Sequence, residues 1–368
     1  MISVLIINGN EIIILIMETK NFYGKFSSGA SFKNMNSNFY SRKNISYVSK
    51  IIDKNLKKMR ISKNDLKHKT LMNIGSGRES LGLLNFNPKK VYNFDISSIN
   101  IKRFKRFIFK NNLNKKIFST QLDISKNKLP KNKFDFIYLH GIIQHVSNVN
   151  LAIQNLSSSM KMNGRMWFYF YRPGSFNIFL GSLQRYLLKN INVNIFYRHL
   201  KKNIKNDIFI DGIMDDCYVP NRQLFYPKQY KKYLENNGCK IYGNTYLKNY
   251  YQKNNFLKFH QSVVFFVEKK SNKKPYVKSK LLNRLRDVNV LNKKLYNNRN
   301  LHHILECAKK INKKNYPEIF KIVIEIEKIK QKVVKKFNNN KQLSKIEFNE
   351  MIKKIIKNIF KSYELQNL

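Results

Sequence analysis

The chain has 368 residues, of which 42% are hydrophobic, so it can bury a core and hold one substantial α/β domain with additional elements. Its formal net charge is +49, but the cations are spread along the sequence, and Lys, Asn, Ile, Phe and Tyr are all frequent, as an AT-rich genome would impose. The charge alone therefore does not establish a nucleic acid or an anionic membrane as the partner. The three cysteines, Cys217, Cys239 and Cys307, match no metal-binding spacing and fit a reducing cytoplasm.

The first residues predict neither a membrane span nor a signal peptide. Residues 2–17 are apolar, but Asn8, Asn10 and Glu11 interrupt the run, which is too short and too polar to cross a bilayer. The run lacks the basic start and the small-residue cleavage site of a signal peptide, and Met17 is an alternative start. We therefore expect a cytoplasmic protein without a transmembrane segment.

Helices and strands alternate after a lead-in at 18–38 that is rich in Ser, Asn and Gly. Apolar residues at helical spacing predict a helix over about 40–59. Short apolar runs then predict five strands, and helical patterns separate them. The strands are expected at 70–74, 90–95, 117–122, 134–139 and 165–171, and the helices near 78, around 101–108 and over about 148–160. Apolar strands flanked by helices indicate a parallel sheet that is covered on both faces.

The pattern changes after Pro173. Residues 175–226 predict an insertion that begins as a helix and ends in an acidic and aromatic segment, which we expect to be a loop over the site. A short helix from Pro227 and two strands, near 240–246 and 261–267, would complete the sheet.

The last hundred residues are Lys-rich and have a helical pattern, unlike the alternating strands and helices that precede them. An apolar stripe from Ile319 to Val333 predicts one helix, and the capping box of Ser344 and Glu347 predicts another. The expected division has three parts. These are an N-terminal extension with a helix (1–65), an α/β domain (66–268) with residues 175–226 as a cap, and a helical C-terminal region (269–368).

The end of the first predicted strand is the most informative segment. Residues 71–79 read Leu-Met-Asn-Ile-Gly-Ser-Gly-Arg-Glu, and Asp95 ends the next apolar run. Gly75 and Gly77 would permit an unusual backbone turn and the close approach of a ligand. An acidic residue at the end of the following strand can bind both hydroxyls of a ribose. Together these residues predict a nucleoside-containing cofactor at the carboxyl ends of the strands.

Five motifs in this order resemble the class I S-adenosylmethionine-dependent methyltransferases, over about residues 66–268. The motifs are residues 72–79, 94–97, 122–124, 134–146 and 160–165. The resemblance implies a Rossmann-like, doubly wound, seven-stranded and mostly parallel sheet, to which the chain would add a helical lead-in and a C-terminal helical appendage. It also implies S-adenosylmethionine as the cofactor and a direct displacement, in which alignment of the reacting groups supplies much of the rate.

The resemblance assigns the cofactor positions residue by residue. They are Asn73, Gly75, Ser76, Gly77, Asp95, Ile96, Asp123, Ile124 and His140. Asp95 would hold the ribose, and Asp123 with Ile124 would lie at the adenine. Asn73 stands where the family usually has an acid, and Glu79 stands where it has a third glycine. No metal is expected.

The acceptor is expected beside the methyl group, where His145 follows the fourth strand and Tyr171 and Arg172 end the fifth. Residues 215–220 resemble a stretch that caps the acceptor pocket in some small-molecule methyltransferases, so Asp216 would contact the acceptor, and His145 and Tyr218 are the catalytic candidates. We expect a small molecule or a sugar-type metabolite as acceptor. RNA methylation through the basic C-terminal helices and a non-catalytic binding module are the alternatives, and the oligomeric state is left open.

Overall fold

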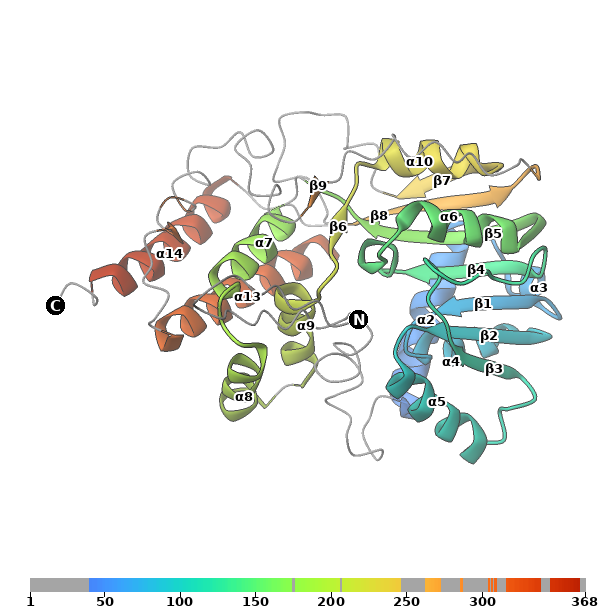
Figure 1. Cartoon of the computed structure of the whole chain (residues 1–368), viewed down its shortest axis with the longest axis horizontal. Helices are drawn as coiled ribbons and strands as arrows, with labels where there is room; N and C mark the ends of the chain where they lie inside the picture. The colour runs from blue at the N-terminus through green and yellow to red at the C-terminus, as the bar shows by residue number, and fades with distance from the viewer. Residues whose placement is uncertain are drawn as a thin grey trace, which may run out of the picture.

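The computed structural model describes residues 40–173, 176–205, 207–245, 262–272, 285–286, 304, 306, 308–309, 316–338 and 345–364. Within these residues the chain forms a seven-stranded sheet with helices on both faces and a group of helices beyond one edge (Figure 1). The apolar run at 2–17, the lead-in at 18–38 and Ser344 lie outside the described residues.

The sheet follows the predicted order of strands. It contains β1 (Thr70–Ile74), β2 (Lys90–Asp95), β3 (Ile117–Gln121), β4 (Phe134–His140), β5 (Met160–Tyr171), β7 (Cys239–Thr245) and β8 (Ser262–Lys269). Their spatial order is β3-β2-β1-β4-β5-β8-β7. Strands β1 to β5 pair in parallel, and β8 runs antiparallel to both β5 and β7. The predicted doubly wound, seven-stranded and mostly parallel sheet is therefore confirmed.

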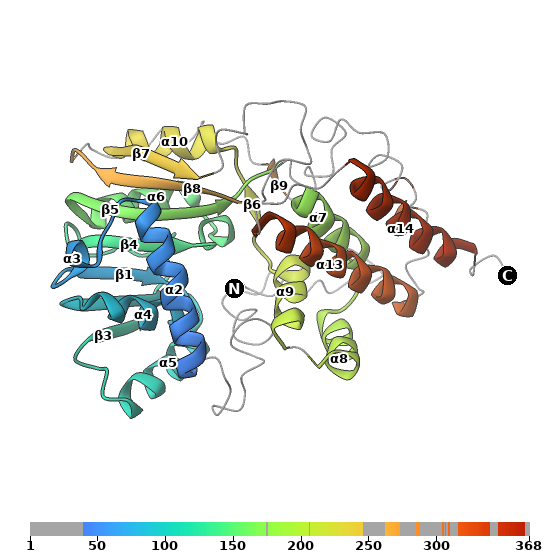
Figure 2. The ribbon, with the colours of Figure 1, turned by 180° about the vertical axis from the view of Figure 1, so that it is seen from behind.

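Helices cover one face of the sheet because alternate strand residues present apolar side chains to each side. This face carries α2 (Arg42–Lys58), α4 (Arg78–Leu83) and α5 (Ser98–Lys110), and Figure 2 shows α2 in front of the sheet. Ile52, Leu81 and Phe104 of these helices share a buried cluster with Phe136 and Tyr138 of β4. The short helices α3 (Lys63–Leu66) and η2 (Leu84–Phe86) complete the connections on this side.

The opposite face carries α6 (Val149–Ser159) and α10 (Pro227–Asn236). Ile153 of α6 and Leu234 of α10 are fully buried with Ile137 and Leu139, the β4 residues that alternate with those of the first face. Gly238, which follows the C-cap Asn237 of α10, has a φ of +75°, as the residue after a helix C-terminus often does.

The sequence predicted that the fifth strand begins at Arg165. In the structure, β5 begins five residues earlier, at Met160. Its pairing with β4 shifts register between Phe134 and Phe136, and Asn163 takes a left-handed φ of +58°. Residues 160–164 therefore form an irregular start of the strand, where a separate turn was expected. Lys161 reinforces this start through an ion pair of 3.0 Å with Asp135.

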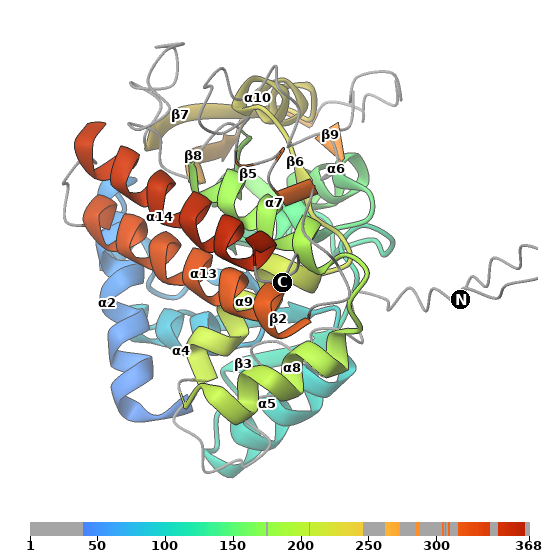
Figure 3. The same cartoon turned by 90° about the vertical axis from the view of Figure 1, so that its left-hand side faces the viewer.

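Among the described residues, five helices lie beyond the carboxyl ends of the parallel strands, and we call them the helical unit. They are α7 (Phe176–Leu188), α8 (Val193–Asn203), α9 (Asp207–Tyr218), α13 (Tyr316–Asn338) and α14 (Lys345–Glu364). Leu183, Ile213, Val323 and Ile352 share one buried apolar cluster, so the insertion and the C-terminal region pack together. Figure 3 shows α13 and α14 side by side. The three-part division of the chain stays a prediction.

The prediction of a loop at the end of the insertion is wrong, because residues 207–218 form α9. Ile210, Ile213, Met214 and Cys217 follow helical spacing and are all buried, and this spacing is the sequence signal that the prediction overlooked. The helix ends at Tyr218, shortly before Pro220. The chain then forms β6 (Gln223–Leu224), which pairs with β9 (Leu285–Arg286). None of the helices in the described ranges is both long and apolar enough to span a bilayer.

Candidate functional site

The carboxyl ends of the parallel strands bring the predicted site residues to one edge of the sheet. The loop Gly75–Gly77, here called the glycine loop, follows β1, and Asp95, His140 and Tyr171 end β2, β4 and β5. Because these strands are parallel and neighbouring, their carboxyl ends meet. This edge faces the helical unit, since the chain passes directly from the end of β5 into α7 (Figure 1).

The two glycines of the glycine loop differ in whether a side chain would fit at their positions. Gly77 has a φ of +98°, and a Cβ atom there would lie within 2.5 Å of the Phe104 ring, so the packing of α5 requires glycine. Gly75 has a φ of +138°, but a Cβ atom there would meet only Ile142 Cδ1, at 3.9 Å. Among the described residues, the space that a Cβ atom of Gly75 would enter is therefore open.

Asn73 supports the glycine loop from within the sheet. Its Nδ2 donates to Asn93 Oδ1 over 3.0 Å, and Ser80 Oγ donates to the same oxygen over 2.8 Å. Asn93 Nδ2 in turn donates to the Gly75 carbonyl over 3.1 Å. Asn73 is fully buried, and its Oδ1 has no hydrogen-bond partner among the described residues. In this arrangement Asn73 acts on the loop through Asn93, and a direct contact with a cofactor stays a prediction.

Asp95 lies at the predicted ribose position, but its carboxylate is only 7% exposed. One oxygen accepts from the Ser97 amide over 2.7 Å and the other from Asn100 Nδ2 over 3.4 Å. Burial raises the pKa of Asp95 to about 6, although these two bonds favour the ionised form. The neighbouring Ile96 carbonyl accepts from Gln121 Nε2 over 3.0 Å, which ties the end of β2 to β3.

Asp123 organises the turn after β3. Its Oδ1 accepts from the backbone amide and the hydroxyl of Ser125, over 2.8 and 2.6 Å. Ile124 is buried, and its carbonyl accepts from Asn155 Nδ2 over 2.9 Å. The structure thus gives both residues a structural role at the predicted adenine position, and their contact with adenine stays a prediction.

His140 presents an aromatic surface at the end of β4. Its ring stacks on Tyr169, with centroids 4.2 Å apart, and lies 5.7 Å from the parallel ring of Tyr138. The residue is nevertheless exposed at this end of the sheet. This position agrees with the prediction that His140 borders the cofactor, which stays a prediction.

His145 lies in η3 (Ile143–His145), where both ring nitrogens have neighbours. Nδ1 is 2.8 Å from the Asn221 carbonyl and Nε2 is 3.1 Å from Gln144 Nε2. Burial lowers the pKa of His145 to about 4, so the ring is neutral at pH 7. A carbonyl can only accept, which assigns the proton to Nδ1 and makes Nε2 the acceptor of the Gln144 amide. General-base action by His145 would therefore require Gln144 to move.

Tyr171 and Arg172 lie where β5 leaves the sheet. Burial raises the pKa of Tyr171, and the negative charges of Asp216 and Asp215 add to the effect. Arg172 is 5% exposed and donates to the Pro173 carbonyl over 3.5 Å. Tyr218 instead faces the helical unit, because its hydroxyl donates to the Ile191 carbonyl over 3.1 Å. The acceptor roles of these residues stay predictions.

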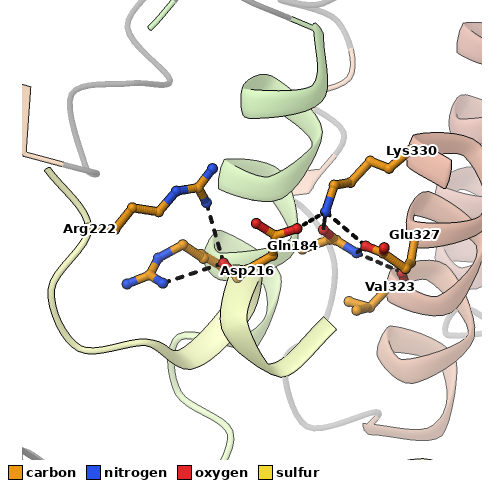
Figure 4. A network of polar contacts seen from close by, with 7 residues as sticks. Gln184, Asp216, Arg222, Val323, Glu327 and Lys330 are labelled. Atoms are coloured by element: carbon orange, nitrogen blue, oxygen red, sulfur yellow. Dashed lines mark hydrogen bonds and ion pairs between the residues drawn. The ribbon is translucent and has the colours of Figure 1, made fainter. Parts of the chain in front are cut away.

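Asp216 belongs to a buried polar network that joins α7, α9 and α13 (Figure 4). Lys330 Nζ donates to Asp216 Oδ2, to Glu327 Oε2 over 2.8 Å and to Gln184 Oε1 over 3.3 Å. Burial alone would raise the pKa of Asp216, but Lys330, Arg222 and Arg185 outweigh it and lower the pKa. The Asp216 carbonyl accepts from Arg222 over 3.3 Å, so this network adjoins the segment that holds His145.

Tyr40 is a residue at this edge that the sequence analysis missed. It precedes Ser41, the N-cap of α2, and its hydroxyl donates to the Ser76 carbonyl over 2.8 Å. Its ring packs against Phe104 and Phe107 of α5, with centroid distances of 5.5 and 4.8 Å. Its place before an N-cap gave no functional signal in the sequence.

The described residues fit a nucleoside cofactor better than a metal. They contain no group of three or more His, Cys, Asp or Glu that could hold a metal ion. The open space beside Gly75, the acid at the end of β2 and the exposed His140 suit a ligand with an adenosine portion and an amino-acid portion.

Residues 72–168 match the family model described as "Methyltransferase domain". No curated protein sequence matches the chain significantly. Similar solved structures include the YcgJ protein of Bacillus subtilis (10% identity, 61% of this chain and 99% of that one, TM-score 0.41). An S-adenosylmethionine-dependent methyltransferase of Mesorhizobium loti is 11% identical over 59% of this chain and 96% of that one, with a TM-score of 0.41. For the PH0226 protein of Pyrococcus horikoshii the identity is 14%, the coverage 68% and 99%, and the TM-score 0.40.

At these identities and TM-scores the fold assignment depends on the strand order and not on the matched structures. The family model spans the segment from β1 into β5, which includes the glycine loop, Asp95 and His140. Residues 72–168 thus carry a methyltransferase domain, and the strand order of the sheet agrees with the predicted resemblance to the class I, S-adenosylmethionine-dependent methyltransferases.

Proposed function

We propose that the chain is an active S-adenosylmethionine-dependent methyltransferase whose acceptor is a small molecule or a sugar-type metabolite. One observation carries the proposal of a cofactor site: Gly75, Asp95 and His140 come from three strands and meet at one edge, with open space beside Gly75. The matched methyltransferase domain covers the same residues.

The residues at this edge would hold the cofactor in the following way. Gly75 leaves room for the amino-acid portion, Asp95 would accept hydrogen bonds from the ribose, and Asp123 with Ile124 would border the adenine. His140 would contribute the face of its ring. Because Asp95 already accepts two bonds from Ser97 and Asn100, its orientation is set before a ligand arrives.

The acceptor would lie between this edge and the helical unit. Support comes from Asn221, whose carbonyl bonds His145, and from the adjacent Arg222, which bonds the Asp216 carbonyl. These two bonds tie η3 to α9 across the place where the acceptor is expected. A segment tied down in this way beside the acceptor position would favour a small acceptor over a polymer.

S-adenosylmethionine, when bound, supplies an activated methyl group for a direct displacement. The contribution of the protein is alignment, exclusion of water and orientation of the acceptor. His145 is neutral at pH 7 and would not act as a cation. Its Nε2 would orient a hydroxyl or an amine once the acceptor displaces the amide of Gln144. Tyr171 would border the same space from the end of β5.

The first test is calorimetric titration of the full chain with S-adenosylhomocysteine. We expect saturable binding with one ligand per chain. Asp95→Ala should weaken the binding at least tenfold, whereas Asp53→Ala, which removes only an ion pair with Lys57 within α2, should leave it unchanged. Absence of binding at millimolar ligand in folded protein would overturn the proposed cofactor.

A second test identifies the acceptor class. The protein is incubated with S-adenosylmethionine labelled in the methyl group and with separate metabolite and RNA fractions of a cell extract. We expect label in the metabolite fraction. Label confined to RNA and removed by ribonuclease would favour the RNA alternative, and ligand binding with no transfer to either fraction would favour a non-catalytic module.

A further inference from the structure

The glycine loop is held by two side chains, one from the sheet and one from the segment that precedes α2. Asn93, inside the sheet, donates to the Gly75 carbonyl over 3.1 Å, and Tyr40, at the start of α2, donates to the Ser76 carbonyl over 2.8 Å. These carbonyls belong to successive peptide groups. Both groups are trans, since the described residues contain no cis peptide bond.

In a trans peptide group the carbonyl and the next N–H point in opposite directions. Holding the Gly75 carbonyl toward Asn93 therefore turns the Ser76 N–H away from Asn93. Holding the Ser76 carbonyl toward Tyr40 likewise turns the Gly77 N–H away from Tyr40. Within the described residues neither N–H has a protein acceptor. Successive free N–H groups of this kind form a concave site for an anion.

Tyr40 is fixed well enough to perform this task. Its ring packs against Phe104 and Phe107, and Ser41 caps the helix that follows. Helix α2 is seated closely on α4, because a Cβ atom at Gly82 would lie 2.9 Å from Ile52 Cδ1. Burial and the negative charges of Asp95 and Glu79 raise the pKa of Tyr40, which keeps the hydroxyl protonated and able to donate.

We propose that Tyr40 is a positioning residue for the cofactor: by holding the Ser76 carbonyl, it directs the amides of Ser76 and Gly77 at the carboxylate of the amino-acid portion. This inference rests on the proposed function, because it presupposes an adenosyl cofactor. It adds the N-terminal helix α2 to the cofactor site. It also assigns recognition of the amino-acid portion to the backbone, where the family's usual acid is replaced by the buried Asn73.

The test compares two ligands that differ only in the amino-acid portion. S-adenosylhomocysteine carries the carboxylate, and 5′-methylthioadenosine lacks it. We expect Tyr40→Phe to lower the affinity for S-adenosylhomocysteine about three- to tenfold, the value of one hydrogen bond, and to leave the affinity for 5′-methylthioadenosine unchanged. Tyr47→Phe, in the helix that follows Tyr40 and 64% exposed, is the matched control and should change neither affinity.

The phenylalanine variant keeps the ring contacts with Phe104 and Phe107 and should fold like the parent. Unchanged affinity for S-adenosylhomocysteine in Tyr40→Phe would overturn the inference while the proposed function stands. An equal loss for both ligands would also overturn it, because general loosening of α2 would then explain the effect. If the parent protein binds neither ligand, the proposed function itself fails.

Discussion

The methyltransferase domain and the helical unit bury polar groups in different ways. Under the glycine loop the domain buries a neutral ladder of Asn73, Asn93 and Ser119, which neighbouring strands bring together in register. The helical unit instead buries charges, because Lys330 and Glu327 are each 4% exposed inside an otherwise apolar core. The ladder is local to three adjacent strands, whereas the charges join helices far apart in sequence.

This difference suggests that the two parts of the molecule position their ligands by different means. A neutral ladder shapes a backbone loop without a large desolvation cost, which suits a site whose ligand is recognised by main-chain groups. A buried ion network costs more to assemble but accepts only one arrangement of its helices. We therefore expect the cofactor side to depend on backbone conformation and the acceptor side to depend on the register of α13 against α7 and α9.

The largest effect should follow from Lys330→Met. The substitution leaves Glu327 and Asp216 without their common cation, so we expect the free energy of unfolding to fall by about 3–5 kcal/mol in urea denaturation. Lys321→Met is the control, because Lys321 is 70% exposed and pairs only with Glu318, and it should cost less than about 1 kcal/mol. Equal losses in the two variants would show that the network does not stabilise the helical unit.

Alanine substitutions at the two glycines of the glycine loop should affect different properties, the free energy of unfolding at Gly77 and the affinity for the ligand at Gly75. Gly77→Ala places a Cβ atom against Phe104 in a left-handed backbone, so the free energy of unfolding should fall by about 2–4 kcal/mol. Gly75→Ala carries the strain of a positive φ but meets no described atom closer than 3.9 Å, so its loss should be smaller, while its affinity for S-adenosylhomocysteine should fall more than tenfold. In the helical unit, Gly212→Ala has no atom closer than 4.0 Å and should be neutral or stabilising. Larger destabilisation by Gly75→Ala than by Gly77→Ala would contradict this assignment.

Asp95 should make stability depend on pH in the direction opposite to that of most carboxylates. Its pKa is about 6 in the folded chain and near 4 when unfolded, so the folded state retains the proton longer. Its contribution is fully present below about pH 4 and is lost as the pH rises through 6. Asp95→Asn should therefore raise the free energy of unfolding at pH 7.5 by about 2 kcal/mol and flatten its pH dependence, yet weaken S-adenosylhomocysteine binding. Urea denaturation between pH 4 and 8 measures this, and an unchanged pH profile would count against it.

The smallest effect is expected from Tyr218→Phe. It removes one hydrogen bond to the Ile191 carbonyl, so the free energy of unfolding should fall by about 1 kcal/mol. The affinity for S-adenosylhomocysteine should not change. Once an acceptor is known, turnover of this variant decides the catalytic prediction: normal turnover would place Tyr218 outside the acceptor site.

The sequence predicted the parts of the molecule whose signals are local. The apolar strands, the glycine loop and Asp95 are encoded within short stretches, and the structure places them as expected. The sequence could not predict that Asp216 pairs with Lys330 or that Tyr218 donates to the Ile191 carbonyl. The partners are far apart in sequence, and no short sequence pattern indicates such contacts. The hydrogen bond of Tyr40 to the Ser76 carbonyl could not be predicted for the same reason, because the two residues are 36 positions apart. Helix α9 does carry a local signal, the helical spacing of its buried apolar residues, but residues 215–220 also resemble a capping stretch between strands five and six of some methyltransferases.

The packing of α13 against α7 has a consequence for synthesis. Gln184 of α7 bonds the carbonyl of Val323, which follows 139 positions later in the chain. On the ribosome the apolar face of α7 therefore emerges long before the helix that covers it, whereas β1 to β5 can already assemble. During synthesis the chain therefore passes through a stage in which the sheet is nearly complete but the apolar face of α7 is still exposed. Intermediates of this kind tend to aggregate or to bind chaperones.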